Sequence, residues 1–283
     1  MEEIKVQNYL QYLFGKARNL VRYRTISREV YKLSRKRILK YRNIYKGKRC
    51  FIIGNGPSLT ADDLELLKDE ICFASNKIYK IYDKTSWRAK FYCVQDFEVA
   101  TEMGQEMKIA MDQADATFFR MDKHDLLESL VLEYKNALMV PLRWYLNKKK
   151  KTKFSGDARS YLYDGTTVTY MAMQLAVYMG FEKIYFIGVD HNYPFYRNEA
   201  GDCVEVDKNM AAHFYENSVK GEEANVSAHR SNNKFMQDVS YSAAKAFSER
   251  NGNVTFYNAT RGGKLDIFER VDLEDILKQN RGK

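Results

Sequence analysis

Residues 49–59 read RCFIIGNGPSL, a short apolar run that leads into a glycine turn. The apolar run predicts a buried strand, and Gly54 and Gly56 permit positive φ and close approach of backbone N–H groups to an anion. Pro57 and Ser58 suit the first turn and cap of a helix, whose N-terminus attracts phosphate. The spacing is neither GxGxxG nor GxxxxGK[ST], which excludes a dinucleotide fingerprint and a P-loop. The segment predicts an anion-binding strand–turn–helix unit, or otherwise only a tight strand-to-helix turn.

The same alternation of strand and helix continues along the chain. Further strand-like runs occupy residues 71–76, 89–96, 116–121, 136–142, 183–193 and 253–260. Helical stretches occupy residues 61–69, 99–114, 165–180, about 233–250, and 271–280. This order predicts an α/β fold with a mostly parallel sheet and helices on both faces.

Polar or glycine-containing groups directly follow four of the predicted strands. They are residues 54–58, 75–76, 95–96 and 190–193. Ligands of such sheets bind outside the carboxyl ends of the strands, so these groups are the candidate site. Gly165, Thr166 and Thr167 begin a predicted helix, where hydroxyl and N–H groups either hold a phosphate or carboxylate or serve only as an N-cap.

Composition narrows the class of protein. The chain has 283 residues, 45% hydrophobic and 29% charged, as in ordinary globular proteins. We expect neither a secretory signal nor a membrane-spanning helix, because no apolar run has the required length. Four scattered cysteines without a CxxC pair indicate a cytoplasmic chain with neither a disulfide framework nor a structural zinc site.

The positive charge is concentrated in an N-terminal arm, taken as residues 1–47, ahead of a main domain at 48–283. Residues 1–49 hold 15 Lys and Arg against 3 acids, a net charge of +12; since the whole chain carries +9, residues 50–283 carry −3. A nucleic-acid-binding domain would more often spread such charge over its folded body, so no nucleic-acid partner is expected. Apolar residues at helical spacing, with a helix cap offered by Thr25 or Ser27, predict two helices.

The basic arm has two interpretations. Tyrosines and leucines interleaved with Lys and Arg over residues 1–45 favour docking on the anionic inner face of the plasma membrane. Alternatively, the apolar residues pack against the main domain or a second subunit of a homo-oligomer and leave the charges solvated.

Histidine is the candidate general base because it titrates near neutral pH. His124 lies in a polar turn. His191 follows a predicted strand, and His213 and His229 lie in the polar segment before the last large helix. Each of these three is a candidate base. The sequence contains no DxD, HExxH or GxSxG motif. No metal site is therefore expected.

Four stretches carry a resemblance to known families: GNGPSL, SNKIYKIY, TTVTYMAMQLAVYMGFEKIYFIGVDHNY and FYNATRGGKLDIFERVDLEDIL. Together they resemble the bacterial sialyltransferases of glycosyltransferase family 42. They resemble still more the related domain of the motility-associated factor glycosyltransferases. A pterin pyrophosphokinase family of archaea shares this type of domain. The resemblance covers about residues 48–276.

The resemblance implies a GT-A-like, Rossmann-type fold and a metal-independent, inverting glycosyltransferase for cell-surface polysaccharide biosynthesis. The donor would be a CMP-linked nonulosonic (sialic-acid-like) sugar with no other cofactor, and the acceptor a glycan or lipid-linked glycan. The implied nucleotide- and donor-binding residues are Gly54, Asn55, Gly56, Pro57, Ser58, Asn76, Gln95, Asp96, Gly165, Thr166, Thr167 and Asp190.

Three positions depart from or extend the family pattern. Cys93 stands where the sialyltransferases carry an asparagine, which moves that contact to Gln95 or Asp96. The pair Thr166–Thr167 replaces a serine-containing turn. Tyr193 is implied to donate its hydroxyl to the leaving phosphate.

The resemblance favours His229 as the base, followed by His213. The alternatives are an ATP-dependent pterin pyrophosphokinase, with Asp96 and Asp190 as the available magnesium ligands, and a non-catalytic module that binds membrane surfaces.

Overall fold

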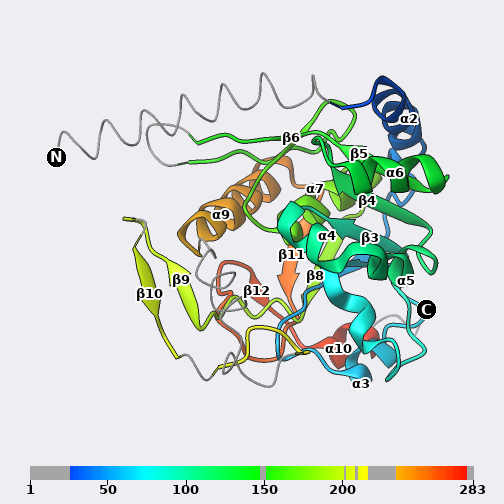
Figure 1. The fold of residues 1–283 in the computed structure, drawn as a ribbon. Coiled ribbons are helices and arrows are strands. Elements are labelled where there is room, and N and C mark those ends of the chain that lie inside the picture. The colour runs from blue at the N-terminus through cyan, green and yellow to red at the C-terminus, as the bar shows by residue number, and fades with distance from the viewer. Residues whose placement is uncertain (1–25, 147–150, 201, 208–209, 216–233, 279–283) are drawn as a thin grey trace, which may run out of the picture.

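The computed structural model describes residues 26–146, 151–200, 202–207, 210–215 and 234–278. The chain folds around a central sheet of eight parallel strands, which confirms the predicted α/β class (Figure 1). The strand order is β12-β11-β8-β1-β2-β3-β4-β5. In that order the strands span Glu269–Arg270, Thr255–Asn258, Lys183–Ile187, Arg49–Ile53, Cys72–Ser75, Phe91–Val94, Ala116–Arg120 and Ala137–Val140.

Both faces of the sheet are covered by helices, and each face has its own apolar core. In β1, Phe51 and Ile53 enter one core, while Cys50 and Ile52 enter the other. A strand buried on both faces reads as an uninterrupted apolar run, which is why RCFII was recognisable.

The first core is covered by seven short helical elements. They are α3 (Ala61–Glu65), η2 (Asn76–Ile81), α4 (Phe97–Met103), η3 (Gly104–Met107), α5 (Lys108–Met111), α6 (Asp125–Glu133) and α10 (Leu273–Lys278). The second core lies under α7 (Val168–Met179) and α9 (Lys234–Asn251).

Helix α2 (Arg28–Ile38) covers the edge strand β5 and is followed by the short helix η1 (Leu39–Tyr41) (Figure 1). The Ser34 hydroxyl accepts a hydrogen bond from the Met139 backbone N–H at 3.0 Å. Arg37 donates to the carbonyl oxygens of Val131 and Tyr134. A strand edge left open is a template for aggregation, and α2 blocks it. The described part of the basic arm is therefore packed on the main domain.

Two small sheets were not expected from the sequence. β6 (Leu142–Arg143) pairs with β7 (Leu162–Tyr163), and β9 (Phe195–Arg197) pairs with β10 (Cys203–Glu205). Elements of two or three residues are too short to leave a periodic signal.

Two expected helix-start details differ in the structure, although both helices begin where predicted. The helix expected from residue 61 does begin at Ala61, but Pro57 and Ser58 do not form its first turn and cap, because Thr60 and Asp63 form a reciprocal capping box there. Ser27 does precede α2, but its side chain makes no capping bond, and its backbone N–H donates instead to Glu128 at 2.9 Å. Gly180 ends α7 in the left-handed conformation, as predicted.

Candidate functional site

The strand order reverses direction at β1. Its sequence neighbour β2 lies on one side, and β8, more than a hundred residues later, lies on the other. In open parallel sheets this switch point is where ligands bind. The two segments that leave the sheet here are the glycine turn, residues 54–58, and the loop 188–193 after β8.

The two glycines let these segments approach each other. The Gly56 N–H donates to the Gly188 carbonyl oxygen at 2.8 Å, and the Gly54 N–H donates to that of Ile187 at 2.8 Å. A Cβ atom at Gly54 would lie 2.8 Å from the Gly188 carbonyl carbon, and one at Gly56 would overlap Asp190 Oδ2. Both glycine N–H groups are thus engaged within the protein rather than presented to an anion, which corrects that part of the expectation.

Ser58 and Asp190 connect the two segments. The Ser58 hydroxyl donates to Asp190 Oδ2 at 2.8 Å. Burial raises the pKa of Asp190, and the hydrogen bonds from Ser58 oppose that shift because they favour the carboxylate. The predicted site residues at the ends of β1 and β8 are therefore brought together.

Of the eleven described residues that have a buried polar side-chain atom without a hydrogen-bond partner, five lie at the carboxyl ends of neighbouring strands. Five adjacent strands each end in or are followed by one such side chain: His191 after β8, Asn55 after β1, Asn76 after β2, Gln95 after β3 and Arg120 at the end of β4. A buried polar group is normally satisfied, so each exception needs an explanation. We call these five residues the edge cluster; a polar ligand at this edge would explain all of them.

Hydrogen bonds to neighbouring residues fix the side-chain amides of Asn55 and Gln95. Asn55 Nδ2 donates to the Ser75 carbonyl at 3.0 Å, and Gln95 Nε2 donates to Asp164 Oδ1 at 3.2 Å. Asn76 has a φ of 50°, which is strained for a residue other than glycine. The Tyr92 hydroxyl donates to the backbone carbonyl of Asn76 at 2.6 Å. With these amide orientations the unpartnered atoms of all three side chains are oxygens, which accept hydrogen bonds.

Arg120 and Asp164 were not predicted from the sequence. Arg120 Nη2 lies 3.3 Å from Asp164 Oδ2, yet its Nε and Nη2 make no well-directed hydrogen bond. Asp164 also accepts from the Thr166 N–H at 3.0 Å, which holds Thr166 at a φ of 60°. Thr167 caps α7, as predicted for an N-cap. The pair therefore connects the end of β4 to the turn before α7.

His191 forms a histidine–carboxylate pair with α9. Its Nε2 lies 2.6 Å from Asp238 Oδ1, and its Nδ1 is buried without a partner. Burial raises the pKa of Asp238, but the hydrogen bonds and charges of His191 and Lys234 outweigh it and lower that pKa below its usual value. A base oriented by a carboxylate is the arrangement of many proton-transfer sites. Sequence alone offered His191 only as one of three possible bases.

Tyr193 is engaged with the same helix. Its hydroxyl donates to Gln237 Oε1 at 2.6 Å, and burial raises its pKa above the usual value. A hydrogen bond from Tyr193 to a leaving phosphate would require this bond to exchange.

Of the other predicted residues, His213 stacks on Tyr215 with ring centroids 5.0 Å apart. The next residue, Phe214, donates its N–H to the Asn55 carbonyl at 2.9 Å, so this segment lies beside the glycine turn. Asp96 is exposed and caps α4, and Pro57 is exposed. His229 lies outside the described residues, so its role as the base stays a prediction.

The described residues contain neither a metal-binding group of side chains nor a helix that could span a membrane. In that part of the chain, no three His, Cys, Asp or Glu side chains are grouped so that they could share a metal ion. Nor is any described helix both long enough and apolar enough to span a membrane.

Comparison with known proteins places the chain in a family. A family model described as "6-hydroxymethylpterin diphosphokinase MptE-like" matches residues 24–195. The chain belongs to the MptE-like family. This confirms the predicted relationship with the pterin and motility-associated factor group, while the link to glycosyltransferase family 42 stays a prediction.

Among solved structures, the MAf glycosyltransferase from Magnetospirillum magneticum AMB-1 is similar to this chain. It is 14% identical, with a TM-score of 0.49, and the match covers 87% of this chain and 39% of that one. The chain thus spans well under half of this relative. No curated protein matches the chain.

Proposed function

We propose that this MptE-like protein transfers a nonulosonic sugar from a CMP donor to a glycan acceptor without a metal ion. The observation that carries the proposal is the edge cluster, five side chains at the ends of five adjacent parallel strands that each have a buried polar atom without a hydrogen-bond partner. The motifs that resemble glycosyltransferases coincide with three of these ends, after β1, β2 and β8.

The chemistry of the cluster matches the two ends of such a donor. The amide oxygens of Asn55, Asn76 and Gln95 are acceptors, and ribose hydroxyls and the cytosine amino group are donors. The Arg120 guanidinium has N–H groups without a hydrogen-bond partner, which can donate to the phosphate or to the sugar carboxylate. One ligand would therefore satisfy both kinds of atom.

The reaction needs a base and a leaving group. The base removes the proton of the acceptor hydroxyl, whose oxygen bonds to the anomeric carbon as the bond from that carbon to the phosphate oxygen of CMP breaks. In-line displacement inverts the anomeric centre. His191, oriented by Asp238, joins His213 and His229 as a proposed base, a contribution typically of about 10²–10⁴ in rate. CMP leaves with less charge than a nucleoside diphosphate, so hydrogen-bond donors can stabilise it.

The family description favours a second candidate, diphosphate transfer from ATP to a pterin alcohol. That reaction requires magnesium held by carboxylates. The carboxylates at this edge of the sheet already have partners: Asp190 accepts from Ser58, Asp164 contacts Arg120, Gln95 and Thr166, and Asp238 contacts His191 and Lys234. The diphosphate-transfer reaction would have to displace these bonds, so we place it second.

Donor hydrolysis tests the proposal. The chain is incubated with a CMP-linked nonulosonic acid in EDTA, with and without glycan acceptors, and release of CMP is measured. We expect release in EDTA, weakened by Asn76→Ala and Gln95→Ala. Asn136→Ala is the matched control, because this asparagine bonds to Ala114 at the opposite end of the sheet. Turnover of ATP with magnesium, and none of the CMP donor, would replace the proposal with the second candidate.

We further propose that the outer surface of α2 and η1 docks on an anionic membrane. Tyr31, Leu39 and Ile44 are large apolar side chains exposed by 41%, 57% and 49%. Lys32, Lys36, Lys40 and Arg42 are exposed along the same segment. Apolar and basic groups together favour binding at a lipid interface.

Vesicle co-sedimentation tests this docking with point variants of the full chain. Removing residues up to Tyr45 would also strip α2 from β5, so truncation is a poor test. Leu39→Glu and Ile44→Glu should reduce binding to anionic vesicles, whereas Leu66→Glu and Leu132→Glu, at equally exposed leucines elsewhere, should not. Equal binding by all four variants would exclude the α2–η1 surface.

A further inference from the structure

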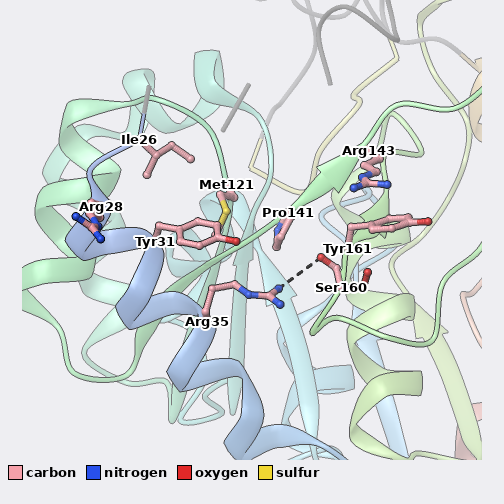
Figure 2. A pocket seen from close by; sticks show the side chains of 9 residues that line it. All are labelled: Ile26, Arg28, Tyr31, Arg35, Met121, Pro141, Arg143, Ser160 and Tyr161. Carbon is pink, nitrogen blue, oxygen red and sulfur yellow. Dashed lines mark hydrogen bonds between the residues drawn. The ribbon is translucent and has the colours of Figure 1, made fainter. Parts of the chain in front are cut away.

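A pocket lies between α2 and the small β6–β7 sheet (Figure 2). Its volume is about 460 Å³. Arg28 and Arg35 come from α2, Arg143 from β6, and Ser160 and Tyr161 from the segment before β7. We call it the arginine pocket. Neither the family description nor the predicted site includes any of these residues.

The charge of the arginine pocket is uncompensated. Three of its lining residues are arginines and none is acidic. Across the described part of the chain, no carboxylate forms an ion pair with Arg28, Arg35 or Arg143. An anion bound in the pocket would be stabilised by the positive charge of these arginines.

Two of the arginines are held in place. Arg35 Nη1 donates to the Ser160 carbonyl at 3.5 Å, and in Figure 2 its side chain extends from α2 toward that residue. The Arg143 guanidinium lies over the Tyr161 ring, 3.8 Å from its centroid. A planar guanidinium fixed by stacking keeps N–H groups available for bidentate contact with phosphate.

The remaining walls are apolar or aromatic. Ile26, Met121 and Pro141 line the pocket, and Tyr31 and Tyr161 add aromatic rings. Such walls accommodate the body of a molecule whose charged group meets the arginines.

The pocket adjoins the edge cluster through continuous chain. Met121 directly follows Arg120 of that cluster, and β7 leads from Tyr161 to Asp164, the partner of Arg120. A ligand in the arginine pocket therefore lies next to the candidate nucleotide site, on the side toward α2.

We propose that the arginine pocket binds a phosphate group carried on a sugar or lipid, as a second ligand site. Identifying this phosphate as part of the glycan acceptor rests on the proposed function. Phosphate binding by the pocket does not. Phosphate carries the negative charge that complements the arginines of the pocket, and a neutral glycan does not.

Titration calorimetry of the full chain tests the proposal with inorganic phosphate and a hexose 1-phosphate as probes. Arg35→Gln and Arg143→Gln should each weaken binding about tenfold, as expected for a charge-assisted hydrogen bond. Arg159→Gln is the matched control, since this arginine adjoins Ser160 but pairs with Asp157 outside the pocket. Thermal unfolding of each variant verifies folding.

Two further experiments show which molecule carries the phosphate and whether phosphate and CMP bind at separate sites. Phosphatidylcholine vesicles with and without phosphatidic acid show whether phosphate on a lipid binds better than soluble phosphate, with the same dependence on Arg35 and Arg143. Asn55→Ala should leave phosphate binding intact and weaken CMP binding, so failure of CMP binding is distinguishable from failure of the pocket. Phosphate affinity that is unchanged in the double variant Arg35→Gln/Arg143→Gln, or lost equally in Arg159→Gln, would overturn the proposal.

Discussion

Replacing Gly56 by alanine tests the packing of the glycine turn against the loop after β8. The new Cβ atom would overlap Asp190 Oδ2 and lie 2.7 Å from both Asp190 Cγ and the Gly188 carbonyl oxygen. Asp190 would have to move, which breaks its 2.8 Å bond from Ser58. The loss of a hydrogen bond to a charged group costs about 1.5–3 kcal/mol, and overpacking costs about 1–3 kcal/mol more.

The expected loss of unfolding free energy is therefore about 2.5–6 kcal/mol for Gly56→Ala. For a domain of this size that lowers the Tm by at least about 5 °C, measurable by calorimetry or circular dichroism. Gly104→Ala is the control: a Cβ there meets nothing within 4 Å, and its positive φ of 52° alone costs about 1–2 kcal/mol. If Gly56→Ala were no more destabilising than Gly104→Ala, the turn would not be packed as described.

Three further predictions concern other contacts. Ser58→Ala removes the hydroxyl bond that favours ionised Asp190 and keeps the backbone N–H bond, so it should raise the pKa of Asp190 further. The resulting loss of stability should be full at neutral pH and shrink as acid protonates Asp190, which urea unfolding at several pH values would show. Asp238→Asn should lower the rate of glycosyl transfer with little change in CMP affinity, because it removes the carboxylate that orients His191; equal loss of both would indicate a structural role. Ser34→Ala should cost about 1–3 kcal/mol, because it leaves the Met139 N–H of edge strand β5 unpaired, and an unchanged Tm would contradict that bond.

The sheet could be predicted from sequence because its strands are apolar on both faces and separated by recognisable turns. Gly54–Ser58 as a strand-end turn and Gly180 as a helix end followed from local rules. The start of the helix at Ala61 was predicted, but the capping role given to Ser58 was wrong because Ser58 is bonded to Asp190, 132 residues away, and Thr60 supplies the cap instead.

Much of the candidate site depends on contacts between distant residues. Arg120 reads as part of an apolar strand, and its pairing with Asp164 is invisible without the fold. The resemblance favoured His229 and His213 over His191, and the pairing of His191 with Asp238 of α9, 47 residues later, is visible only in the fold. An aspartate directly before Gly165 was a turn signal that could have drawn attention to Asp164.

The central claim is that the edge cluster binds CMP without a metal ion. Titration calorimetry of the full chain with CMP in EDTA tests it most directly, with CDP, UDP and ATP compared in the presence and absence of magnesium. The account predicts that CMP binds in EDTA and that Asn76→Ala and Gln95→Ala weaken its binding by up to about tenfold, while Asn136→Ala does not. Binding of ATP only with magnesium, and no binding of CMP, would contradict the account.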